Sequence, residues 1–191
     1  MRLEVHSHFT LLGGTAPVEA LAAHVAEEGM SHLALTDHQA LYGAVAFARV
    51  CRRFSVRPIT GMSVDMALPG ETTVSGGQRG RLVLLAKNAR GYRSLCYIAS
   101  WLQGDPRRET RLRQGLAWEL LAEHREGLLC IEGGQSGWLF NLLRAGHEAE
   151  AIRYLSRLGG LFQGVVITPA PPIVEAESPA QRLAWETHIL G

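Results

Sequence analysis

The chain has 191 residues, of which 47% are hydrophobic and 19% are charged, and its formal net charge is +1. This length and composition suit one globular domain over residues 1–191, and a near-neutral charge does not supply the positive field of an autonomous nucleic-acid-binding protein. No apolar run reaches the roughly 18 residues of a membrane span, and the N-terminus lacks a signal-peptide pattern, so we expect a cytoplasmic protein without membrane contact.

The first half of the chain alternates β-prone runs with amphipathic patterns, which predicts a parallel sheet. The predicted elements are a strand over Arg2–His6, a turn at Gly13–Gly14, a helix from Pro17 to about Glu28 that Gly29 ends, a strand at Leu33–Leu35, a helix from about Leu41 to Phe54, and a strand that begins at Pro58–Thr60 and continues over Ser63–Leu68.

The second half begins with a glycine-rich hairpin connection over 70–80, which leads into the strand at 81–86, and it contains an arginine-rich loop over 104–113. A glycine-rich turn at 132–137 either binds an anion at the start of the next helix or simply reverses the chain. The predicted elements are strands at 81–86, 128–131 and 162–168, helices at 91–102, from 118, at 138–144, 148–158 and 179–190, and a proline cluster at 169–172.

Three cysteines, Cys51, Cys96 and Cys130, are widely separated, and no two of them form a Cys-x-x-Cys pair. An odd number at such spacing excludes a disulfide framework and a zinc ribbon. We therefore expect reduced core thiols, with Cys130 buried in the strand at 128–131.

Two histidine-bearing segments end β-prone runs: Val5-His6-Ser7-His8-Phe9 and Leu33-Ala34-Leu35-Thr36-Asp37-His38. Imidazoles and carboxylates at strand ends are ligands that zinc, manganese and iron accept. The residues alone also allow a structural interpretation, in which His6 and His8 share one face of a strand and Asp37 caps the following helix.

Seven segments, in this order and at these spacings, carry a family resemblance: His6–Gly14, Leu33–His38, Leu41–Gly43, Pro58–Gly61, Leu82–Asn88, Gly91–Cys96 and Glu123–Leu128. Over about the first 165 residues the chain resembles the PHP (polymerase and histidinol phosphatase) domain of bacterial DNA polymerase III alpha subunits, and it is most similar to the error-prone branch. The resemblance implies a distorted (β/α)7 TIM-like barrel with a trinuclear metal cluster that hydrolyses phosphoesters or proofreads 3′ ends. Because the sequence ends at Gly191, we expect that barrel to lack at least one strand.

Carried over residue by residue, the resemblance leaves only His6 and His38 at metal-ligand positions. Its first His-x-His pair falls on Glu4 and His6, so His8 is out of register, and its last two ligands lie beyond the end of the chain. The other ligand positions hold Gly13, Ser63, Arg81 and Gly134. Two imidazoles beside an arginine make a poor cation site, so the resemblance implies a vestigial site with no expected cofactor and with Arg81 inside the old metal cleft.

A reduced site is the alternative. Glu4, His6 and His8 would share one strand face, and Asp37 and His38 would arrive from the next strand end, which allows a mononuclear zinc or manganese site. We expect instead that Asp37→Asn and His38→Ala change stability more than activity.

The basic cluster comprises Arg107, Arg108, Arg111 and Arg113. Arginines in a loop can neutralise phosphates, so the cluster is a candidate nucleic-acid contact or partner surface; alternatively it is a solvated connector. The flanking Trp101 and Trp118 are expected to pack rather than stack on bases.

Two functions follow. The first is a catalytically degenerate PHP-type domain that serves as a structural or interaction module in DNA replication or translesion synthesis, with a DNA polymerase or replication proteins as partners, weak DNA contact, and an open barrel edge that favours a homo-oligomer. The second is a metal-dependent phosphoesterase or 3′–5′ exonuclease that uses the reduced site.

Overall fold

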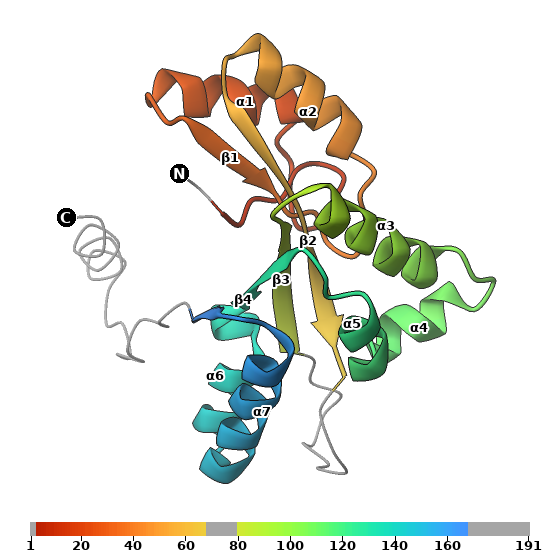
Figure 1. The fold of residues 1–191 in the computed structure, drawn as a ribbon. Coiled ribbons are helices and arrows are strands. Elements are labelled where there is room, and N and C mark those ends of the chain that lie inside the picture. Colours follow the sequence, from red (N-terminus) through yellow and green to blue (C-terminus); the bar gives the residue numbers. More distant parts are fainter. Residues whose placement is uncertain (1–2, 68–79, 168–191) are drawn as a thin grey trace.

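The computed structural model of the chain describes residues 3–67 and 80–167, which form an α/β fold around a mixed sheet (Figure 1). The strands lie in chain order: β1 (His32–Leu35), β2 (Arg57–Met66), β3 (Gly80–Ala86), β4 (Leu128–Glu132) and β5 (Val165–Ile167). β1 and β5 are the two edges of this sheet. The predicted α/β class is confirmed, but the described residues form an open sheet rather than the predicted seven-stranded barrel.

β2 is the long strand that joins the two parts of the molecule (Figure 1). Its first half, from Arg57 to Thr60, pairs in parallel with β1, and its second half, from Gly61 to Met66, pairs with β3. The strand predicted to begin at Pro58–Thr60 and to continue over Ser63–Leu68 is thus found as one element, Arg57–Met66.

The predicted parallel pairing is found for β1 with β2, but the sheet as a whole is mixed, because β3 runs antiparallel to both β2 and β4. The antiparallel direction of β3 against β2 agrees with the hairpin predicted between them. Met66 is paired with Gly80, so the chain returns to the sheet at the end where it left it. A parallel strand needs a connection that crosses the length of the sheet. Among the described strands, β1 with β2 and β4 with β5 form the parallel pairs.

The predicted N-terminal strand is also wrong over its described part, residues 3–6. The Val5 carbonyl accepts a hydrogen bond from Thr36 N at 2.8 Å, but the Val5 N–H donates to the Thr36 hydroxyl at 2.9 Å. The Thr36 hydroxyl thus replaces the backbone carbonyl that a neighbouring strand would offer to Val5 N–H, and regular strand pairing does not extend from this contact.

Two helices, α1 (Val18–Glu27) and α2 (Ala44–Arg53), pack on β1 and the first half of β2. They bury a core that includes Phe47 and Cys51. α1 ends as predicted, with Gly29 in the left-handed region at φ +67°. α2 begins three residues after the predicted Leu41, because residues 41–43 form a turn instead.

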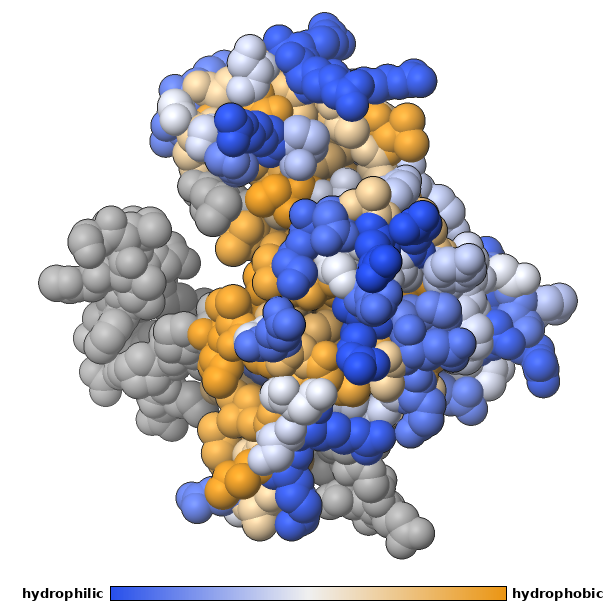
Figure 2. Space-filling view, viewed as in Figure 1, coloured by the Kyte–Doolittle hydropathy of each residue, from blue (hydrophilic) through white to orange (hydrophobic). Residues whose placement is uncertain are grey.

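The larger core lies against β3, β4 and the second half of β2. Its largest buried side chains include Trp138, which is 2% exposed, and Tyr154, which is 0% exposed. Its helices are α3 (Ala89–Gln103), α5 (Trp118–Glu123), α6 (Trp138–Arg144) and α7 (Glu148–Leu161). In Figure 2 the side formed by α3 and α4 (Arg108–Gln114) is mostly hydrophilic, whereas hydrophobic side chains gather on the side of β4 and α6.

α4 corrects the predicted loop over 104–113. Asp105 accepts the backbone N–H of Arg107 at 2.6 Å, and its own carbonyl accepts the N–H of Arg108 at 2.9 Å. This turn starts a short helix at Arg108.

The 70–79 part of the predicted connection, the proline cluster at 169–172 and the predicted helix at 179–190 lie outside the described residues. Among the residues that the structure describes, no helix is long and apolar enough to span a membrane.

Gly91, on the buried side of α3, tests the packing of that helix. A Cβ added there would overlap the carbonyl oxygen of Gly127, which lies in the turn beside α3. We expect Gly91→Ala to lower the free energy of unfolding by about 1–3 kcal/mol in urea titrations. The matched control is Gly159→Ala in α7, where an added Cβ meets no atom within 4 Å and helix propensity predicts a gain of about 1 kcal/mol. Equal effects of the two changes would contradict this packing.

Candidate functional site

The site is built around the carboxylate of Asp37, which follows β1 and is 2% exposed. Its Oδ1 accepts hydrogen bonds from Ser7 N and Thr10 Oγ1, both at 2.7 Å. Its Oδ2 accepts from Ser7 Oγ at 2.8 Å. Both oxygens are thus bound by the chain's own donors, as a buried charge requires.

The Thr10 hydroxyl connects this carboxylate to both histidines at the expected ligand positions. It accepts the backbone N–H of His38 at 3.0 Å and lies 3.5 Å from His6 Nδ1. The structure therefore brings His6, Asp37 and His38 together around one threonine, which the sequence analysis did not single out.

The His38 side chain belongs to a second cluster on β2 and β3. His38 Nδ1 lies 3.3 Å from Ser63 Oγ, and His38 Nε2 lies 3.4 Å from Asp65 Oδ2. Asp65 Oδ1 is in turn 3.8 Å from Arg81 Nε. Arg81 and His38 thus contact the same carboxylate, and the location of Arg81 in the old metal cleft stays a prediction. Asp65 was missed, although it lies two residues after Ser63 and therefore on the same strand face.

Glu4, His6 and His8 do not form the common face that the alternative site requires. Glu4 Oε1 lies 3.8 Å from His6 Nε2. His8 is exposed, and its ring lies against Phe9 with the centroids 4.2 Å apart. Over residues 3–67 and 80–167, no three or more histidine, cysteine, aspartate or glutamate side chains are grouped so that they could hold a metal ion.

Ser63, His38 and Asp65 form a chain of polar groups with the composition of a hydrolase triad. Its chemistry is blocked by position, because Ser63 is completely buried and a substrate carbonyl cannot reach its hydroxyl. Asp65 also lies beside Arg81 as well as His38, so its charge is already compensated. The contacts of this cluster join the segment after β1 to β2 and β3, and they leave no hydroxyl group accessible to a substrate.

Glu132 lies at the end of β4, where the glycine-rich turn begins. The sequence analysis did not predict that its side chain would be buried and bonded to this turn. The side chain is 1% exposed, and its two oxygens accept the N–H groups of Gly134 at 3.0 Å and Leu139 at 3.2 Å. The place where an anion was considered is thus filled by the chain's own carboxylate. Burial raises the pKa of Glu132 to about 7, although the two N–H groups act in the opposite direction.

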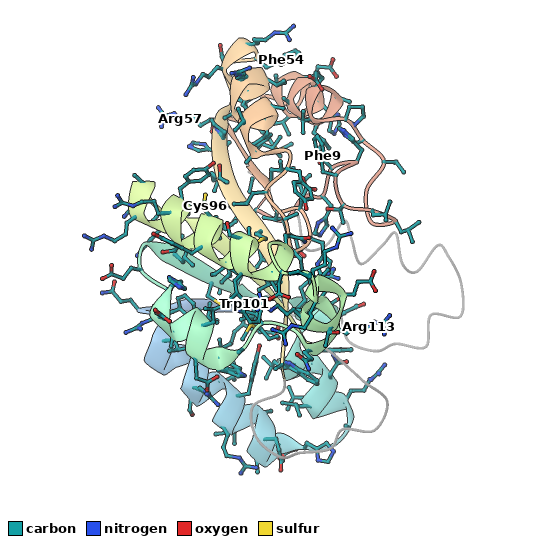
Figure 3. The ribbon with its side chains drawn as sticks, turned by 90° about the vertical axis from the view of Figure 1, so that its right-hand side faces the viewer. Phe9, Phe54, Arg57, Cys96, Trp101 and Arg113 are labelled. Carbon is teal, nitrogen blue, oxygen red and sulfur yellow. The ribbon has the colours of Figure 1, made fainter. Side chains whose placement is uncertain are left out.

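The candidate nucleic-acid arginines lie on and before α4, and not all of their charges are available (Figure 3). Arg107 and Arg111 both pair with Asp105, and Arg111 also covers the ring of Trp101 at 4.5 Å. The Arg107 N–H, helped by these guanidinium groups, lowers the pKa of Asp105. Arg108 and Arg113 are exposed and form no ion pair within the described part of the chain.

The three cysteines are free thiols, as predicted, but only Cys51 and Cys130 are buried core residues, whereas Cys96 is half-buried. Burial raises the pKa of Cys51 to about 11 and that of Cys130 to about 12, so both are protonated and unreactive near neutral pH. Trp118 is buried, with its Nε1 donating to the Ala67 carbonyl at 3.0 Å, which confirms that it packs in the core.

Known proteins match most of the chain. The family described as "PHP domain" matches residues 2–167. The DNA polymerase III subunit alpha of Bacillus subtilis (strain 168) is 35% identical over 162 residues, which are 85% of this chain and 14% of that protein. The error-prone DNA polymerase of Symbiobacterium thermophilum is 32% identical over 177 residues, 86% of this chain and 15% of that protein. The chain thus spans about a seventh of the length of these relatives.

Among solved structures, the chain is similar to an amidohydrolase from Chromobacterium violaceum. The TM-score is 0.49 at 13% identity, and the match covers 96% of this chain and 95% of the other. A similarity of this size carries no functional conclusion.

Asp37→Asn should destabilise the fold. The amide supplies one acceptor oxygen where the carboxylate supplies two, and it removes the charge that strengthens all three hydrogen bonds. We expect the free energy of unfolding to fall by about 1–3 kcal/mol in urea titrations. The control is Glu28→Gln, an exposed change that should alter stability by less than about 0.5 kcal/mol. An unchanged stability for Asp37→Asn would contradict the network.

Glu132 should make stability depend on pH. Because folding raises its pKa from 4.5 to about 7, the folded state holds this proton at pH values where the unfolded state has lost it. The contribution is fully present below about pH 4.5 and is lost as the pH rises through 7, by at most about 3 kcal/mol. Urea titrations at a series of pH values between 4.5 and about 7 give the free energy of unfolding as a function of pH. This free energy should decrease less with rising pH for Glu132→Gln than for the natural chain, whereas Glu27→Gln, at an exposed position, should leave the pH dependence unchanged. Identical slopes for all three would refute the assignment.

Proposed function

Because the chain belongs to the PHP domain family and matches DNA polymerase III alpha subunits, we propose that it is a catalytically degenerate PHP domain, a structural or interaction module of a bacterial replicative or error-prone polymerase. In this proposal residues 1–191 are one domain. The observation that supports it is the Arg81–Asp65–His38 cluster, because Arg81 is a cation at a position where the family resemblance expects a ligand.

The charges in this cluster oppose a metal ion. The guanidinium of Arg81 carries a permanent positive charge, and it lies 3.8 Å from the carboxylate nearest to His38. A divalent cation at His38 would have to compete with Arg81 for Asp65 and would be repelled by it. Arg81 therefore compensates the cleft's negative charge without a metal.

The remaining candidate ligands are engaged as well. Asp37 has three hydrogen-bond donors on its two oxygens, and His6 lies beside Glu4 rather than beside a second free imidazole. Hydrolysis of a phosphoester needs an open coordination position, and usually two metals that share a carboxylate. Because Asp37 and Asp65 are bonded to other residues of the chain, these contacts favour the scaffold function over the phosphoesterase function.

The partners follow from the relatives. Those proteins are named as subunits of DNA polymerase III, and this chain corresponds to about a seventh of their length. We propose that the domain contacts a polymerase or other replication proteins in the bacterial cytoplasm, and that any DNA contact is local. A homo-oligomer formed through the edges of the sheet stays a prediction.

The decisive experiment measures metal content and hydrolysis on one preparation. The chain is purified without chelator, zinc and manganese are added back, and bound metal and phosphodiester hydrolysis are assayed together. We expect less than about half an equivalent of metal and no turnover. Stoichiometric metal with hydrolysis that His6→Ala abolishes would overturn the proposal and establish a working phosphoesterase.

Arg81→His supplies the complementary variant, since it puts an imidazole where the resemblance has a ligand and removes the competing cation. We expect it to bind more zinc than the natural chain, whereas Arg93→His, at an exposed position on α3, should not. Equal zinc binding by the natural chain and the Arg81 variant would show that Arg81 does not oppose the metal.

A further inference from the structure

The outward face of α3 is basic. No acidic residue occurs within Ala89–Gln103, while Lys87, Arg90 and Arg93 lie at the start of the helix and are exposed. In the described part of the chain, the side chains of Lys87 and Arg93 form no ion pair, and Arg90 pairs with Glu126 at 3.3 Å. Figure 3 shows α3 lying across the outside of the molecule, with Cys96 and Trp101 along it.

A turn over residues 124–127 runs beside α3 and extends this surface. Ser94 Oγ donates to the Glu126 carbonyl at 2.9 Å, and Lys87 N donates to the Gly127 carbonyl at 2.9 Å. These bonds tie the turn to the helix. Lys87–Arg90, Glu126 and Gly127 line an open cavity of about 440 Å³ between them.

An aromatic pair adjoins this basic surface. The rings of Tyr97 and His124 are stacked, with centroids 5.0 Å apart and planes 14° apart. Tyr97 is 61% exposed, so much of its surface is open to solvent. Seven residues of helix separate Arg90 from Tyr97, which is about 10 Å along the axis.

We propose that α3 and the turn at 124–127 bind single-stranded nucleic acid. Lys87, Arg90 and Arg93 would contact phosphates around the cavity, and a base would stack on the Tyr97–His124 pair. A cationic track beside an exposed aromatic ring is the arrangement that binds single strands without sequence preference. The proposal is independent of whether the old metal cleft holds a metal.

α4 is the weaker candidate for the same ligand. Two of its four arginines are neutralised by Asp105, and Trp101 is already covered by Arg111. The ring beside α4 is thus covered, and two of its four arginines are compensated, whereas at α3 one cation of three, Arg90, is paired. Its exposed Arg108 and Arg113 provide a matched control for the cations of α3.

The aromatic pair also favours nucleic acid over an acidic protein. An acidic segment would need only the cations, whereas the stacked, exposed tyrosine gains from a planar base. A change at Tyr97 therefore separates the two ligands.

The test is fluorescence anisotropy of labelled oligothymidylate with the 191-residue chain at about 50 and 200 mM salt. We expect a dissociation constant of about 10⁻⁴ M or tighter at the lower salt, weakening as salt rises. Arg93→Ala should reduce the slope of log K against log salt by about 0.7, the value for one phosphate contact with a single strand. Tyr97→Ala should weaken binding by between about fivefold and a hundredfold.

Arg108→Ala with Arg113→Ala should change affinity less than twofold, and circular dichroism should confirm that every variant folds. Absence of binding at low salt, or an equal loss for the α4 variant, would overturn the proposal. So would a Tyr97→Ala protein that binds as tightly as the natural chain, particularly if polyglutamate competes as well as the oligonucleotide does, because the surface would then be a general anion patch.

Discussion

The buried carboxylate of Asp37 is the constraint on which the end of the sheet depends. A carboxyl group at 2% exposure needs hydrogen-bond partners, and Ser7 and Thr10 supply three of them. That requirement holds the segment 7–10 over the end of β1, and Thr10 in turn positions the backbone of His38. The two histidines come together as a consequence of this network, without any need for a metal to collect them.

β2 couples this end of the sheet to the larger core. Its first half pairs with β1 beside α1 and α2, and its second half carries Ser63 and Asp65 while its opposite face packs Met62 and Val64 into the larger core. The cluster of His38, Asp65 and Arg81 therefore links β2 and β3 to the segment that follows β1. In this position a set of mutually compensated charges stabilises the junction of two cores, a role consistent with a scaffold.

The sequence predicts best where local chemistry decides the structure. The glycine that ends α1 and the apolar period of α6 placed those helices within a residue or two. The antiparallel direction of β3 against β2 follows from the glycine-rich hairpin connection, whereas the antiparallel pairing of β3 with β4 was missed, because three helices separate those strands and no local pattern fixes their relative direction. Asp65 and Glu132 were missed for a related reason: a single acidic residue in a strand or beside glycines resembles a solvent-exposed one until its burial is known.

The burial of these acids changes what the net charge means. Asp37, Asp65 and Glu132 are all buried and bound to donors within the fold, so their negative charges do not reach the surface. Most of the other acidic side chains are exposed, as are most basic ones. The formal charge of +1 is nevertheless unevenly distributed, because α3 has no acidic residue of its own and carries exposed cations at its start. A near-neutral sequence can in this way present a local surface for phosphates.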